Sequence, residues 1–372
     1  MKRVKLISVL LATAMLCGVL SGCMAMIGEV TLNADGSGKL KISSGVSEKF
    51  LSEDQLAEMK ADSETVAFQY NGKTYYGSVE TQDFADMTAE SNSSERYFRN
   101  PDGSWTVWVK ISEDTAADMG ADSSAEASQE IMDVIMEDLV GIYTLHAPAA
   151  LTQIAGGKTG ITLSGKDLTL DMVAMGLGTD HPQYGTFVFT TAKSVPTFAD
   201  VAADKWYAPA VRVLALGGMV NGVGSGRFAP ENTLTVAQFC QMVARAGGKE
   251  IGADASGYWA AKAITACVAD GYVKDRGAVT PANYEVPITR EEAIAAMTLL
   301  TDAIPTEETE TAKTSIPDYA QISADYQELI ACAYSNGITS GTDAKGTFKP
   351  KGELTRAEIC QLFLNVGVIA VD

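Results

Sequence analysis

The sequence predicts an α+β N-terminal domain followed by an all-α C-terminal domain, a bundle of three helix-loop-helix repeats. Alternating apolar residues separated by turn signals run to about residue 195, and a repeated pattern begins at residue 197. A chain of 372 residues has room for at least two domains of roughly 150 residues each. The expected boundaries are 23–195 for the α+β domain and 197–248, 257–302 and 316–367 for the repeats.

Residues 1–22 have the features of a signal peptide. Lys2, Arg3 and Lys5 precede a short apolar stretch over 6–20, which is too short for a comfortable membrane span. The segment ends Leu-Ser-Gly-Cys, which resembles the lipobox of bacterial lipoproteins. That resemblance implies cleavage before Cys23 and acylation of Cys23, so that the protein is extracytoplasmic and anchored in the cell membrane. A plain cleaved signal with a chance cysteine is the alternative.

The chain is acidic. Its net charge of −19 becomes −22 once the three cations of the signal are removed, and such a charge disfavours nucleic acid as a partner. Four cysteines lie beyond the signal segment: Cys240, Cys267, Cys332 and Cys360. They form no CxxC pair, and the chain has only two histidines, so we expect no metal site and no cofactor. Because two of these cysteines match Ile294 of another repeat, we favour buried free thiols over disulfides.

The α+β domain is expected to contain paired strands and two helices. The expected hairpins join 30–32 to 40–42, 66–70 to 73–76 across Asn71-Gly72, and 161–163 to 168–172; further strands follow the turn at 100–103 and occupy 184–190. Helices are expected at 48–60 and 128–140, with an acidic loop at 113–127 between them in the sequence. The opening hairpin gives this domain a weak resemblance to LppM-like bacterial lipoprotein domains, which implies no particular chemistry.

The repeats share three short motifs. The first and third repeats contain Gly-apolar-x-x-Gly at 218–222 and 337–341 and Phe-x-Pro at 228–230 and 348–350. The second and third contain Thr-Arg-x-Glu at 289–292 and 355–358. These residues resemble the S-layer homology family over 197–367. The resemblance implies three units around a central helix bundle, with grooves that bind secondary cell-wall polysaccharide, a polymer that often carries pyruvyl carboxylates.

The Thr-Arg-x-Glu motif separates a structural role from a binding role. Threonine followed three residues later by Glu or Gln is a capping box, which would satisfy free amides at a helix start. The expected caps pair Thr235 with Gln238, Thr289 with Glu292, and Thr355 with Glu358. Arg290 and Arg356 would occupy the first helical position, where a cation opposes the helix dipole. We therefore expect these two arginines to bind an anionic sugar, with ion pairing to a nearby acid as the alternative.

The three repeats are not equivalent. The first has Val236 at the position of the arginine, and the second lacks the Phe-x-Pro motif, so at most two grooves carry the arginine of the motif. Trp206 and Trp259 are further candidates for polysaccharide binding by stacking on sugar rings, although a core position for both is favoured. We expect a monomer without catalytic residues that links the membrane to the cell wall. The alternatives are an N-terminal domain that senses a ligand or acts as an enzyme on wall polymers, positioned by the repeats.

Overall fold

The computed structural model describes residues 24–90, 94–111, 140–175, 185–301 and 303–369. The signal segment, Cys23, the acidic loop at 113–127 and nearly all of the helix expected at 128–140 lie outside the described residues. The chain divides into two compact units, with the main boundary between Lys193 and Ser194 and with the short segment Phe98–Gly103 grouped with the second unit. None of the described helices has the length and apolar character of a membrane span.

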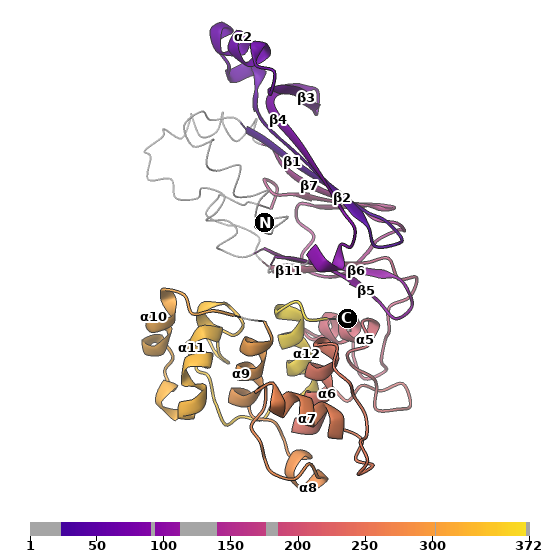
Figure 1. The fold of residues 1–372 in the computed structure, drawn as a ribbon, viewed down its shortest axis with the longest axis vertical. Coiled ribbons are helices and arrows are strands. Elements are labelled where there is room, and N and C mark those ends of the chain that lie inside the picture. Colours follow the sequence, from indigo (N-terminus) through magenta and orange to yellow (C-terminus); the bar gives the residue numbers. More distant parts are fainter. Residues whose placement is uncertain (1–23, 91–93, 112–139, 176–184, 302, 370–372) are drawn as a thin grey trace. The chain divides into compact units, whose positions relative to one another are not determined.

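The N-terminal unit contains two β-sheets (Figure 1). The larger sheet has the strand order β3-β4-β2-β1-β7-β10-β9, and the smaller has the order β5-β6-β11-β8. The strands of the larger sheet are β1 (Met24–Leu32), β2 (Gly38–Ser47), β3 (Val66–Tyr70), β4 (Lys73–Phe84), β7 (Val140–His146), β9 (Ile161–Ser164) and β10 (Asp167–Asp171). Those of the smaller sheet are β5 (Glu95–Arg99), β6 (Trp105–Ile111), β8 (Thr152–Ala155) and β11 (Gly185–Thr190).

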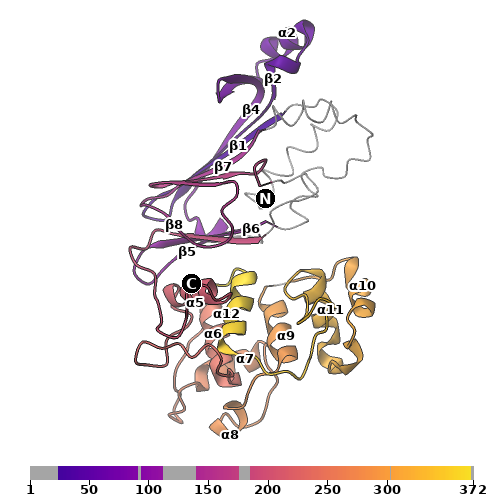
Figure 2. The same cartoon turned by 180° about the vertical axis from the view of Figure 1, so that it is seen from behind.

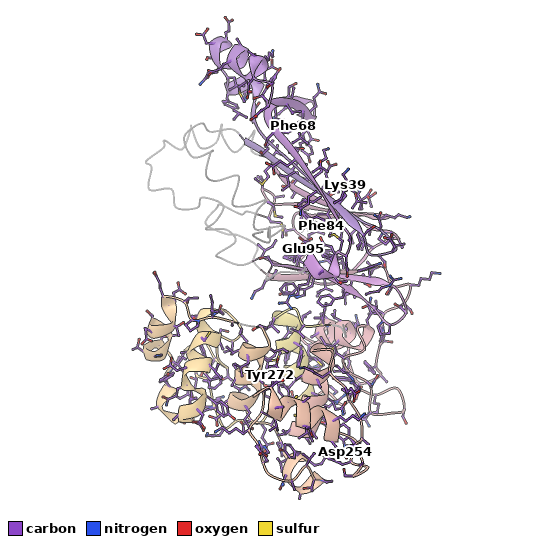
Figure 3. All side chains as sticks on the ribbon, viewed as in Figure 1. Lys39, Phe68, Phe84, Glu95, Asp254 and Tyr272 are labelled. Carbon is purple, nitrogen blue, oxygen red and sulfur yellow. The ribbon has the colours of Figure 1, made fainter. Side chains whose placement is uncertain are left out.

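Apolar side chains of both sheets meet in one core. Val30 and Leu145 of the larger sheet belong to the same buried cluster as Val107 and Phe189 of the smaller sheet. Strand alternation explains this arrangement, because every second residue of a strand points to the same face. The two sheets therefore pack face to face, as the side chains between them show in Figure 3.

The hairpins expected at 30–42, 66–76 and 161–172 are present. Asn71 and Gly72 have φ angles of 48° and 77°, which are the positive values that a type I′ turn requires between β3 and β4. Leu163 pairs with Leu168 and Ile161 with Leu170 across the β9–β10 turn. One pairing was not expected: β1 and β7 are parallel neighbours, although they lie more than a hundred residues apart in the sequence.

The helix expected at 48–60 is shorter than the apolar pattern indicates. A 3₁₀ turn, η1 (Glu48–Phe50), comes first, and α2 (Glu53–Ala61) begins only after Ser52. The physical reason is a capping box between Ser52 and Gln55, which fixes the helix start there. A second short turn, η2 (Thr88–Glu90), follows β4.

The C-terminal unit is helical (Figures 1 and 2). Its α-helices are α5 (Ala208–Leu216), α6 (Val236–Ala246), α7 (Ala261–Ala269), α8 (Pro281–Tyr284), α9 (Arg290–Leu300), α10 (Glu308–Ser315), α11 (Gln327–Ser335) and α12 (Arg356–Asn365). Two 3₁₀ turns, η3 (Tyr319–Gln321) and η4 (Ala324–Tyr326), precede α11. The helices pack in pairs from different repeats: α6 against α7, α9 against α11, and α12 against α5.

The four cysteines of this unit are buried free thiols, as predicted from the match of Cys240 and Cys360 to Ile294. Cys240 and Cys267 are neighbours on the packed pair α6 and α7, where the Cys267 thiol donates to the Cys240 carbonyl oxygen at 3.5 Å. Burial raises the pKa of the Cys360 thiol to about 12. These thiols therefore fill the core as small apolar groups.

Candidate functional site

Three helices of the C-terminal unit start with the same cap. Thr235, Thr289 and Thr355 each accept a hydrogen bond from the backbone amide of the third helical residue, and that residue's side chain accepts from the threonine's own amide. The third residues are Gln238 in α6, Glu292 in α9 and Glu358 in α12, as the capping pattern predicts. Each cap satisfies two backbone donors that a helix start would otherwise leave unpaired.

The first residue of each capped helix is hydrogen-bonded to the segment before the next capped helix. The amides of Val236, Arg290 and Arg356 donate to the carbonyl oxygens of Val286, Gly352 and Asn232 at 2.9, 2.8 and 2.9 Å, respectively. In each case the acceptor lies six residues before the third residue of the next capped helix. The three helix starts are therefore equivalent positions, and they meet one another in turn.

Arg356 is held by the loop that follows α5. Its Nε donates to the Phe228 carbonyl oxygen at 3.0 Å and its Nη2 donates to the Asn221 carbonyl oxygen at 2.8 Å. The guanidinium also lies 4.4 Å from the centroid of the Phe228 ring, within the range of a cation–π interaction. These contacts offset the unfavourable interaction of this cation with the helix dipole.

Arg290 has an acidic partner within the protein. Its Nη2 donates to Glu358 Oε1 at 3.1 Å, and its side chain is only 15% exposed. Its Nε is buried without a hydrogen-bond partner among the described residues. Burial alone would raise the pKa of Glu358, but hydrogen bonds from Thr355 and Arg290 outweigh burial and lower it. Ion pairing, the alternative for these arginines, thus occurs at Arg290, and the dipole argument alone does not require an external ligand.

The expectation that Trp206 and Trp259 belong to the core is wrong. The exposed fractions of their side chains are 60% for Trp206 and 44% for Trp259, whereas Trp105 and Trp108 are buried. Each lies just before the first helix of its repeat, and the indole rings rest on the surface. Trp259 Nε1 donates to the Glu285 carboxylate at 2.8 Å, which fixes the ring, while Trp206 packs against Tyr207 edge to face. A fixed, exposed indole is well suited to stack on a sugar ring.

Two aspartates that sequence reasoning did not single out as site residues shape the loops. The Asp200 carboxylate accepts from the amides of Phe228 and Ala229 at 2.7 and 2.8 Å. The Asp318 carboxylate accepts from the amides of Phe348 and Lys349 at 2.8 and 2.7 Å. Ala229 and Lys349 have φ angles of 58° and 57°, which are strained for residues other than glycine. These aspartates could be recognised in the sequence because each lies about thirty residues before a Phe-x-Pro motif.

Among the described residues of the N-terminal unit, Glu95 is a fully buried acidic group. Glu95, labelled in Figure 3, accepts hydrogen bonds from the hydroxyls of Tyr97 and Tyr143. Burial raises the pKa of Glu95 to about 7, although the two tyrosine hydrogen bonds oppose that rise. Among the described residues, no group of three histidine, cysteine or acidic side chains is placed to hold a metal ion. This cluster joins the two sheets, because Tyr97 belongs to β5 and Tyr143 to β7.

Comparison with known proteins finds matches for two segments of the C-terminal half. Residues 197–240 and 315–360 match the S-layer homology domain, the family that the motifs of the first and third repeats resemble. The matched residues do not include the second repeat.

Two enzymes share part of the sequence. The amylopullulanase of Thermoanaerobacterium thermosulfurigenes is 29% identical over 230 residues, which are 59% of this chain and 11% of that protein. The exoglucanase XynX of Acetivibrio thermocellus is 33% identical over 177 residues, which are 45% of this chain and 16% of that protein. The chain therefore spans a small fraction of the length of these relatives.

A solved structure also resembles this chain. The folded domain of LppM from Mycobacterium tuberculosis aligns with 47% of this chain and 93% of its own length, at 10% identity and a TM-score of 0.24. A TM-score of this size carries no argument about function.

Proposed function

We propose that the C-terminal half attaches the protein non-covalently to secondary cell-wall polysaccharide. S-layer homology domains in general mediate attachment to the cell wall, and this chain contains two segments that match that domain. We propose further that the second repeat, residues 257–302, is a third unit of the same assembly. The observation that supports this proposal is the hydrogen-bond register that the three capped helix starts share. The Arg290 amide donates to the segment before the next capped helix, as the amides of Val236 and Arg356 do.

Two of the proposed binding residues, Arg290 and Arg356, begin capped helices, and Trp259 is linked to the start of α6 because it and Thr235 both donate to Glu285. Arg290 and Arg356 supply cations, and Trp206 and Trp259 supply exposed aromatic rings. A pyruvylated sugar presents a carboxylate and an apolar ring face, so it suits recognition by guanidinium and indole groups. Arg290 would then share its donors between Glu358 and the ligand, which an arginine with five N–H groups can do.

We also propose that Cys23 carries acyl chains, so that the protein links the cell membrane to the wall. The support is the Leu-Ser-Gly-Cys sequence after an apolar stretch. Replacement Cys23→Ala should move the protein from the membrane fraction to the wall extract or the medium. Retention of the variant in washed membranes would refute the anchor and leave the wall-binding proposal standing.

Co-sedimentation with purified walls tests the attachment. The chain from position 23, with Cys23→Ser to remove any lipid, should sediment with untreated walls and remain in solution once secondary polymers are stripped from them. Equal binding to both preparations would mean that peptidoglycan, and not the secondary polymer, is the ligand. No binding to either would refute the proposed function.

A further inference from the structure

An ion pair links two of the capped helix starts. Arg290, the first residue of α9, pairs with Glu358, the third residue of α12. By the same register, the first residue of α6 faces the third residue of α9, which is Glu292. That first residue is Val236, which has no charge and is 1% exposed. The capped start of α9 thus lacks the arginine that the register would place there.

An arginine from a different part of the chain occupies this place. Arg276 lies in the loop between α7 and α8, and its Nη2 donates to Glu292 Oε1. The backbone of Arg276 is fixed as well, because its amide donates to the hydroxyl of Tyr284 at 3.1 Å and Tyr284 is fully buried. Arg276 is therefore held at its backbone by Tyr284 and at its guanidinium by Glu292, both from its own repeat. The side chain of Arg276 remains 27% exposed.

A second cation and an aromatic ring lie in the same region. Lys274 Nζ lies 4.7 Å from the centroid of the Tyr326 ring and 2.6 Å from Asp325 Oδ2, so the loop of the second repeat reaches the start of the third. The turn η4, which ends at Tyr326, packs against α9, and the Ser323 hydroxyl just before it donates to Glu291, the neighbour of Glu292, at 2.9 Å. Two cations, an aromatic ring and a hydroxyl thus gather around one helix start.

Two donors of this group have no hydrogen-bond partner in the described part of the chain. Arg276 Nε and the Tyr326 hydroxyl are both buried and make no hydrogen bond to any residue that the structure describes. An unpaired buried donor costs about 1–3 kcal/mol, and proteins tolerate that cost mostly where a ligand or a bound water supplies the missing acceptor. A carboxylate is an acceptor that suits a guanidinium and a phenol together.

The geometry points to a third binding site for the anionic wall polymer. In this site Arg276 takes the place of the arginine that is missing from the first repeat, which has Val236 at that position. Its ligand is a carboxylate-bearing sugar, held by Arg276 with Lys274 as the second cation and Tyr326 as the aromatic surface. This inference rests on the proposed function, and it raises the number of cation-bearing sites from two to three. Neither the motif nor the family match reveals it, because Arg276 lies outside the Thr-Arg-x-Glu pattern and outside the matched residues.

The test compares wall binding by variants of the chain from position 23, each with Cys23→Ser. Arg276→Gln should weaken binding about tenfold, equivalent to ~1.4 kcal/mol. Lys262→Gln is the control, because it removes one positive charge from an exposed ion pair with Glu250 and should bind like the parent. Walls whose carboxylates have been amidated with a carbodiimide form the second arm, in which the parent should lose affinity and Arg276→Gln should lose less.

A double variant separates ligand binding from folding. Arg276→Gln with Glu292→Gln removes both charges of the ion pair, so it leaves no unpaired carboxylate at the helix start. If Arg276 binds the polymer, the double variant should bind as weakly as Arg276→Gln. Parental affinity in either variant would overturn the inference and show that Arg276 serves only Glu292. Failure of the parent itself to bind walls would instead refute the proposed function.

Discussion

Arg356 Nε donates to the carbonyl oxygen of Phe228 at 3.0 Å, and the guanidinium lies 4.4 Å from the centroid of the Phe228 ring. These two residues are 128 positions apart in the sequence. The contact joins the start of α12, in the last repeat, to the loop of the first repeat. Arg356 therefore stabilises the fold in addition to any part it takes in binding.

The first prediction is that Arg356→Ala destabilises the C-terminal unit. The helix dipole argument alone predicts unchanged or slightly higher stability, but the variant also loses two hydrogen bonds from a charged group. Such bonds contribute about 1.5–3 kcal/mol, so we expect a loss of that order in the free energy of unfolding, measured by urea denaturation. Arg227→Ala is the matched control, because its guanidinium is 65% exposed and its ion pair with Asp200 should contribute less than about 1 kcal/mol. Equal stability of the Arg356 variant and the parent would contradict this account.

The second prediction concerns the caps. Thr355→Ala removes the acceptor for the Glu358 amide and should lower the free energy of unfolding by about 1 kcal/mol. Thr355→Ser keeps the hydroxyl and should retain most of the stability. The measurement is thermal denaturation followed by circular dichroism. If alanine and serine gave the same melting temperature, the hydroxyl would not be the stabilising group.

The third prediction uses the exposure of the indoles. Trp206→Ala removes a side chain that is 60% exposed, so it should change stability by no more than about 0.5 kcal/mol while it weakens wall binding.

Iodide should quench the fluorescence of Trp206 and Trp259 but not that of the buried Trp105 and Trp108. Added wall polymer should protect the quenched fraction. Unprotected fluorescence under saturating polymer would exclude the two exposed tryptophans from the site.

The fourth prediction is a pH dependence of the N-terminal unit. Burial raises the pKa of Glu95 from its ordinary value of 4.5 to about 7. Between these two values the folded state binds more protons than the unfolded state, so stability is highest below pH 4.5 and falls as the pH rises towards 7. Glu95→Gln should remove this contribution, which is about 1.4 kcal/mol for each unit of pKa difference. The same pH slope in the variant and the parent, by urea denaturation at pH 4.5 and 7, would contradict the assignment.

The sequence predicts the local parts of this fold well. The Asn71-Gly72 turn identifies the β3–β4 hairpin, and Thr235, Thr289 and Thr355 identify three helix starts, because in each case adjacent residues determine the conformation. The parallel pairing of β1 with β7 was not predictable in the same way. It depends on packing between segments far apart in the sequence, for which strand alternation sets a face but not a partner.

The site was predicted in part. The motif places Arg290 and Arg356 correctly at the first helical position, but it does not reveal that Glu358 and Phe228 contact them. The pattern also does not show whether a tryptophan just before a helix is exposed or buried, because that depends on the packing of its neighbours. Arg276 was missed because its role depends on the register between repeats, which becomes visible only when Val236 and Glu292 are placed next to each other.

Calorimetric titration with the secondary polymer purified from the walls tests the central claim most directly. The chain with Cys23→Ser should give saturable heats, and Arg290→Ala with Arg356→Ala should weaken the affinity by about ten- to a hundredfold, the change for ~1.4–2.8 kcal/mol. The affinity should also fall when the polymer's carboxylates are amidated. If the parent produced only heats of dilution, or if the double variant bound the polymer as tightly as the parent, the claim that these helix starts hold wall polysaccharide would be wrong.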